Sequence, residues 1–187
     1  TVGNEVQLLA DLGEDFYLPL GCDYVLAPLI NIDVAQVQDF AWTPAELFAC
    51  DTCFNQTILP LEKTRTYHFT YTDINGCTAS DAITIYLDRT RNVFIPNVFS
   101  PNGDGNNDIF YINAGKDVSS IKSFRVFDRW GSLLHEVTDF APNDPNFGWD
   151  GKFHGKNVVG NVFAYAIEIE FLDGWQERMT GGVTLIR

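Results

Sequence analysis

The sequence predicts an all-β fold in which two β-sandwich domains follow one another. Short runs of β-branched and aromatic residues alternate with turn residues along most of the 187 positions. No window has the apolar periodicity of an amphipathic helix. The charge also divides the chain. Residues 1–90 hold 13 acidic and 3 basic residues, a net charge of −10, whereas residues 91–187 hold 12 acidic and 9 basic residues, a net charge of −3. The total is −13. We therefore place a domain boundary near residue 90.

A hairpin is the clearest element of the first domain. Residues 66–72 are mostly β-branched and aromatic, residues 82–87 read AITIYL, and DING supplies a turn between them. The stretches YVLAPL and DFAWTPAEL upstream are shorter strand candidates. Trp42 lies between Cys22 and Cys77, which is compatible with an aromatic ring packed on a disulfide in an immunoglobulin-like sandwich.

All four cysteines lie in this first domain. An even number without clustered histidines favours disulfides and an oxidising compartment, and we predict the pairs Cys22–Cys77 and Cys50–Cys53. The CDTC stretch has zinc-ligand spacing but no second pair of ligands, so metal binding and free thiols stay as alternatives.

The second domain contains two further predicted hairpins. Residues 123–137 form two strands around a turn at residues 129–131, and residues 162–171 alternate large apolar with small or charged side chains. Asp173 and Gly174 then make a tight turn before a last strand that reaches residue 187. The expected architecture is two immunoglobulin-like β-sandwich domains in tandem, residues 1–90 and 91–187.

The sequence argues against several classes of function. Glu168 and Glu170 share a strand face, but two carboxylates on a solvated strand usually form a polar surface and not an acid–base pair. The three histidines have no neighbours that would complete a triad or a metal site, and no nucleophile, phosphate-binding or dinucleotide motif is present. We expect no enzymatic activity, and the acidic excess argues against nucleic-acid binding. No apolar run approaches the ~18 residues of a membrane helix.

The loop within residues 94–110, FIPNVFSPNGDGNNDIF, is the strongest candidate for a site. Oxygen-bearing side chains recur there at alternate positions, which suits calcium, and the candidate ligands are Asp104, Asn106 and Asp108. The match to an EF-hand loop fails at Asn107, where glycine is required, and at Asn113, where a bidentate glutamate is required. The alternative is a cluster of Asx turns with no ion.

Three tryptophans fall in or near predicted turns: Trp130, Trp149 and Trp175. Exposed rings could stack on sugars or on a partner protein, whereas packing at the end of the sandwich is the commoner fate. A calcium-dependent carbohydrate-binding module of a secreted protein is therefore an alternative reading of the chain.

Several motifs of the second half occur together in one known family. The stretches VFIPNVFSPNGDGNNDIF, FRVFDRWGSLLHEV, WDGKFHGKNVVGNVFAYAIEI and GGVTLIR resemble the gliding-motility-associated C-terminal domain of Bacteroidota, the type B C-terminal domain of type IX secretion substrates. The resemblance covers about residues 92–187. Residues 1–90 more loosely resemble the PKD/Ig-like repeats of large surface adhesins.

This resemblance implies a secretion signal on a secreted cell-surface adhesin. The partners it implies are the outer-membrane translocon of type IX secretion and an outer-membrane protein of the PorP/SprF type, with the glycan or protein ligand of the parent adhesin left unidentified. Without an initiator Met or an apolar leader, the chain is expected to be a fragment or processed product. Loops and edge strands are common recognition devices, so we predict two regions of partner contact. Their residues are Pro101, Asn102, Asp104, Asn106, Asn107 and Asp108 in the loop, and Gly181, Gly182, Val183, Thr184, Leu185, Ile186 and Arg187 in the last strand.

Overall fold

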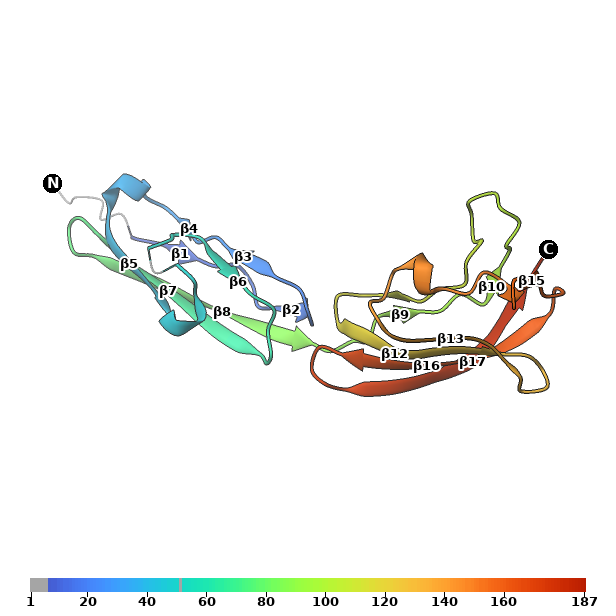
Figure 1. The fold of residues 1–187 in the computed structure, drawn as a ribbon. Helices are drawn as coiled ribbons and strands as arrows, with labels where there is room; N and C mark the ends of the chain where they lie inside the picture. Colours follow the sequence, from blue (N-terminus) through green and yellow to red (C-terminus); the bar gives the residue numbers. More distant parts are fainter. Residues whose placement is uncertain (1–6, 51) are drawn as a thin grey trace. The chain divides into compact units, whose positions relative to one another are not determined.

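The computed structural model describes residues 7–50 and 52–187 and confirms the predicted all-β tandem of immunoglobulin-like sandwiches (Figure 1). The chain divides into two compact units between Arg89 and Thr90, one residue from the predicted boundary. In the described residues the only helical segments are three single 3₁₀ turns, Val34–Gln36, Ala45–Leu47 and Pro145–Phe147. None of the described residues form a helix long and apolar enough to cross a membrane.

The N-terminal unit is built on one four-stranded sheet with two short strand pairs beside it. The sheet order is β2 (Phe16–Pro19), β8 (Thr78–Asp88), β7 (Arg65–Asp73) and β5 (Val37–Thr43). The pairs are β1 (Ala10–Asp11) with β4 (Leu29–Ile30), and β3 (Tyr24–Leu26) with β6 (Gln56–Ile58). The predicted hairpin is β7–β8, whose alternation buries Tyr67, Phe69 and Tyr71 on one face.

The cysteine prediction is half right. Cys50 and Cys53 form a disulfide, and the side-chain amide of Gln56 donates to the carbonyls of both cysteines. The predicted Cys22–Cys77 disulfide is wrong, because both thiols are free.

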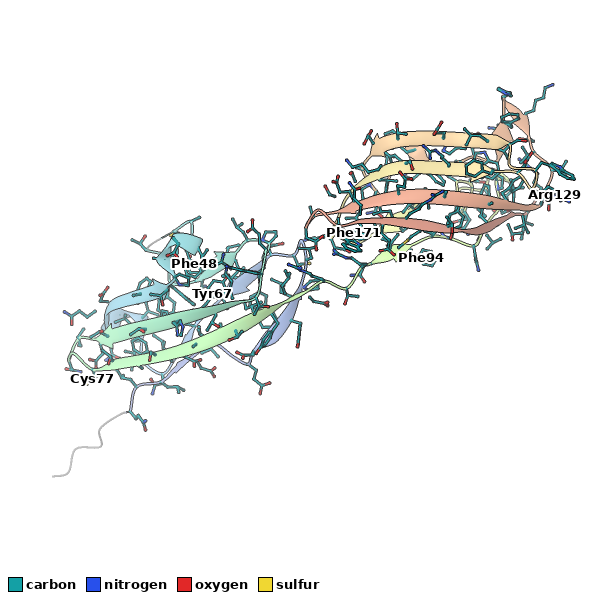
Figure 2. The ribbon with its side chains drawn as sticks, turned by 90° about the horizontal axis from the view of Figure 1, so that it is seen from below. Phe48, Tyr67, Cys77, Phe94, Arg129 and Phe171 are labelled. Atoms are coloured by element: carbon teal, nitrogen blue, oxygen red, sulfur yellow. A yellow bond between two sulfur atoms is a disulfide. The ribbon has the colours of Figure 1, made fainter. Side chains whose placement is uncertain are left out.

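Strand β8 explains why this pair cannot form. Cys77 lies in the β7–β8 turn, directly before the first residue of β8 (Figure 2), whereas Cys22 follows a segment held at the other end of β8 by the bond from the Leu20 amide to the Asp88 carbonyl. An 11-residue strand spans roughly 36 Å at its rise per residue. A disulfide needs a Cα separation of about 4.4–6.8 Å. Trp42 accordingly packs on Phe48 and Phe69, and its indole donates to the Phe54 carbonyl.

The C-terminal unit is built on a five-stranded sheet. Its order is β10 (Val98–Phe99), β17 (Gln176–Leu185), β16 (Val162–Phe171), β12 (Val118–Phe127) and β13 (Leu133–Phe140). Two short pairs, β9 (Val93–Phe94) with β11 (Asn113–Ala114) and β14 (Lys152–Phe153) with β15 (Lys156–Asn157), complete it. Both predicted hairpins, β12–β13 and β16–β17, are present.

Local chemistry explains these two turns. The Asp128 carboxylate accepts the amides of Trp130 and Ser132, and these bonds, with the one from Ser132 first, lower the pKa of Asp128. The Asp173 carboxylate accepts the Trp175 amide in the same way. Gly131 and Gly174 follow with positive φ angles of 83° and 80°, which only glycine adopts without strain.

Candidate functional site

The loop between β10 and Phe110 is closed on itself. The Ser100 amide donates to the Asn107 carbonyl, and Phe110 forms a backbone bridge to Trp149 that fixes the far end of the loop. Gly103, Gly105 and Asn107 all have positive φ angles, which allows the chain to turn repeatedly within a few residues.

The oxygens of this loop point largely at its own backbone. The two Asp108 carboxylate oxygens accept the amides of Gly103 at 2.7 Å and Gly105 at 2.8 Å. Asp104 accepts the Asn102 side-chain amide and the Asn106 backbone amide, and these bonds, the one from Asn102 first, lower the pKa of Asp104. The Asn102 side-chain oxygen in turn accepts the Asp104 amide. These are the bonds of consecutive Asx turns, the alternative weighed against a calcium loop.

Calcium binding stays a prediction for Asp104, Asn106 and Asp108. Over residues 7–50 and 52–187, no three His, Cys, Asp or Glu groups gather closely enough to hold a metal ion. The two carboxylates nevertheless lie in one short loop, so the ion can be tested directly.

The last strand lies next to this loop. Strand β17 pairs in parallel with β10, with Thr184 opposite Val98 and Leu185 opposite Phe99. The Thr184 amide donates to the Asn97 carbonyl and the Ile186 amide donates to the Phe99 carbonyl. The two predicted contact regions, far apart in the sequence, are therefore brought together at one end of the C-terminal unit (Figure 1).

Gly151 marks the point where these regions meet. A Cβ atom added there would contact the side chains of Leu185, Pro101 and Arg187. The Arg187 guanidinium donates to the carbonyls of Gly151 and Val158, so it is held against the 151–158 segment instead of standing clear of the surface. Val183 and Leu185 are buried in the core, and their side chains are not available to a partner.

The adjacent glycines of β17 face opposite sides of the sheet. Gly181 lies opposite Tyr165, whose ring covers it so closely that an added Cβ would collide with the phenol. Gly182 lies opposite Ala164 and is exposed. A shallow hollow of about 450 Å³ lies here, lined by Arg129, Asn161, Val162, Phe163, Ala164, Gly181 and Gly182. Sequence reasoning placed Arg129 in a turn and gave it no role; its position beside Gly182 depends on strand order, which the sequence does not reveal locally.

The tryptophans divide into two groups. Trp149 is 1% exposed and packs on Phe99 and Phe163, with its indole donating to the Lys152 carbonyl. Trp130 and Trp175 are 86% and 59% exposed in their hairpin turns. The packing alternative therefore holds for Trp149 alone.

Two ionisable residues that were considered for catalysis, Glu170 and His135, make contacts that stabilise the fold. Glu170 forms an ion pair with Lys122 at 2.8 Å, and this bond is the main reason that the pKa of Glu170 is lowered. The His135 ring contacts Phe124 and the Phe147 carbonyl, and burial lowers its pKa. No arrangement of an acid, a base and a nucleophile is present among these groups.

Comparison with known families identifies one match. Residues 93–185 match the family model described as the CHU_C Type IX secretion signal domain. A search of the curated proteins found no match.

Several solved structures are similar at low identity. The SrpA adhesin of Streptococcus sanguinis is 10% identical over 94% of this chain and 93% of that chain, with a TM-score of 0.45. The fibronectin(III)-like modules of Clostridium thermocellum CbhA are 12% identical over 96% and 93%, with a TM-score of 0.34. Dimeric latent PorU of Porphyromonas gingivalis is 11% identical over 97% of this chain and 20% of that chain, also at 0.34. Similarity this low carries no argument about function.

Proposed function

Residues 93–185 belong to the family of type IX secretion signal domains, and from this membership we propose that the C-terminal unit is the address by which the outer-membrane translocon exports the chain. A type IX secretion signal implies a secreted substrate. The N-terminal unit is then a repeat of a cell-surface adhesin, and a role of that adhesin in gliding motility belongs to the same proposal.

The observation that carries the proposal is the family match, and the geometry of the unit supports it. The 100–108 loop and the last strand meet at one end of the sheet, where much of the loop is exposed. A receptor can read such a folded surface without unfolding the domain. The partner we propose is an outer-membrane protein of the PorP/SprF type acting with the translocon.

The N-terminal unit has features that suit a position outside the cell. Its local disulfide, Cys50–Cys53, is stable where thiols are oxidised. Secretion signal domains and immunoglobulin-like sandwiches are non-catalytic kinds of domain, and we extend this to propose that the whole chain is not an enzyme.

Export of a reporter tests this function. A reporter protein preceded by an inner-membrane export signal and followed by all 187 residues should reach the surface of a Bacteroidota host with an active type IX system, as measured by protease accessibility on intact cells. The same reporter followed by residues 1–89 alone should stay inside. Retention of the full-length fusion, with the host's own substrates still exported, would contradict the proposal.

A further inference from the structure

Strand β17 is an edge strand along most of its length. Its inner side pairs with β16 from Gln176 to Thr184 in an unbroken register. On its outer side, β10 covers only Thr184 and Leu185. Within residues 7–50 and 52–187, no strand lies beyond residues 176–183 of β17.

The direction of the backbone groups on this edge follows from the bonds at its end. The Leu185 amide points toward β16, because it donates to the Asn161 carbonyl, and the Thr184 amide points outward to Asn97. Amides alternate along an antiparallel strand. The N–H and C=O groups of Arg178, Thr180 and Gly182 therefore point outward as well, and they form a ladder ready to bond an extended chain.

This edge carries two charged side chains, Glu177 and Arg178, but few of the other features that usually protect an edge strand. Residues 176–185 contain no proline and no lysine, and β17 has no bulge against its neighbour. The opposite edge strand, β13, has a register shift against β12 and a residue with positive φ, Asp139. A long, regular edge with this little protection is a ready template for pairing with an extended strand.

The hollow beside Gly182 adds side-chain specificity to this ladder. Its floor is formed by Gly182 and Ala164, which leave room for a large side chain arriving from a neighbouring strand. The Arg129 guanidinium lines it and forms no ion pair or hydrogen bond with the described residues. Figure 2 shows Arg129 at the end of the sheet away from Phe171. This cation would attract a carboxylate or the face of an aromatic ring.

We propose that the outward edge of β17, from Gln176 to Gly182, receives an extended strand of the exporting outer-membrane protein, with a large apolar side chain over Gly182 and an acidic residue beside Arg129. This inference rests on the proposed function and specifies how the signal is read. The edge leads directly into Thr184 and the loop contacts, so the added strand would end where β10 begins.

Charge disfavours a second copy of the chain as the occupant. Antiparallel pairing of two β17 edges about Thr180 would place Arg178 of one copy over Gly182 of the other, next to its Arg129. Like charges in such positions oppose association. An acidic or aromatic strand has no such penalty.

Export of edge variants tests the proposal in the reporter with all 187 residues. Gly182→Trp fills the hollow from within, and Thr180→Pro removes one outward amide without breaking a bond to β16. Thr138→Trp, which places the same ring on the exposed face of the opposite edge strand, is the control. Export of the first two should fall at least about tenfold, the loss expected for removing roughly 1.4 kcal/mol or more of binding free energy. The control should match the unmodified chain, and unfolding midpoints should show that all variants fold.

The possible failures are distinguishable. If the unmodified chain is retained in the cell, the proposed function fails; if it is exported together with folded Gly182→Trp and Thr180→Pro, only this inference fails.

Hydrogen exchange supplies a second readout. On adding a purified PorP/SprF-type protein in detergent, the amides of Arg178, Thr180 and Gly182 should become protected while those of Glu177 and Met179, already bonded to β16, change little. Protection of the same three amides in a dimer of the chain alone would overturn the proposal in favour of self-association.

Discussion

Gly181 and Gly182 are neighbours in β17 with opposite requirements for space. The Tyr165 ring lies over Gly181 and also packs on Phe110, with 5.7 Å between the ring centroids. At Gly182 an added Cβ would meet only Val162 at an ordinary 3.4 Å and the Phe163 carbonyl at 3.7 Å. The first glycine therefore serves packing, and the second leaves the outer surface open.

Substitution by alanine should separate these two roles. Gly181→Ala should lower the free energy of unfolding by about 1–3 kcal/mol, because Tyr165 must move within a packed core. Gly182→Ala should leave it unchanged or raise it by roughly 0.5 kcal/mol, since alanine is favoured over glycine within a strand. Denaturant titration of the two variants measures both, and equal losses would show that the Tyr165 contact is not the cause.

His135 makes the stability of the C-terminal unit depend on mildly acidic pH. Burial lowers its pKa below 6.5, although the Phe147 carbonyl and the charge of Asp150 act in the opposite direction. The folded state therefore favours the neutral ring. The stability that this preference contributes is fully present above the pKa of the unfolded state, near 6.5, and is lost as pH falls through the lower pKa of the folded state. The lowered carboxylate pKa values of Asp104 and Asp128 act only at lower pH, near and below 3.8.

His135→Gln should therefore flatten the fall of the unfolding midpoint between neutral pH and the range in which carboxylates begin to protonate. His154→Asn, which replaces an exposed histidine with positive φ by a residue that tolerates this conformation, should keep the original slope. Thermal melts across this pH range measure the two dependences. If the unfolding midpoint of His135→Gln falls with pH as steeply as that of the unmodified chain, another group causes the pH dependence.

At the scale of the element, the Asp108 carboxylate holds the first half of the 100–108 loop. Asp108 accepts two loop amides, and a neutral amide side chain can accept only at its single oxygen. Asp108→Asn should cost about 1–2 kcal/mol locally. Faster hydrogen exchange at the Gly103 and Gly105 amides would report this. Asn106→Ala, which changes the same loop but leaves both Asp108 bonds in place, is the control.

Calcium binding by the same loop can be tested directly. Because its carboxylate oxygens already accept amides, we expect calcium and a chelator to leave the unfolding midpoint of the intact chain unchanged. A midpoint that rises with calcium and falls back in Asp104→Asn would establish an ion site there.

The Cys50–Cys53 disulfide is an element of the N-terminal unit alone. A bridge this short closes a very small loop, for which chain entropy gives at most about 2 kcal/mol. Replacing both cysteines by serine should lower the unfolding midpoint of the N-terminal unit modestly, and Gln56 should still hold the segment through its two carbonyl bonds. An equal fall in the unfolding midpoint of the C-terminal unit would contradict the view that the disulfide stabilises the N-terminal unit alone.

At the scale of the whole molecule, the sequence predicted what is encoded over short distances. The hairpins β7–β8, β12–β13 and β16–β17 follow from alternation and turn residues within about 25 positions. The parallel pairing of β10 with β17 joins opposite ends of the domain, and nothing local in either strand specifies it. The Cys22–Cys77 prediction failed for a related reason, because spacing in the sequence does not reveal that β8 separates the two thiols.

The candidate site was predictable to a similar extent. The loop was recognisable by composition, and the last strand by its resemblance to a family. Their meeting at Gly151 and the hollow between Arg129 and Gly182 depend on which strands become neighbours. Trp149 shows the same dependence, because its place in the core comes from Phe99 and Phe163, which lie far from it in the sequence.

Under the proposed function, the pairing of β10 with β17 also allows the receptor to test whether the chain is complete. The two predicted contact regions hold each other in place, since Phe99 pairs with Leu185 and its carbonyl accepts the Ile186 amide. A polypeptide that is truncated before β17, or that has not yet folded, presents no such surface. A receptor that reads this surface, as we propose, would therefore select finished molecules over defective ones, and sorting and quality control would be a single event.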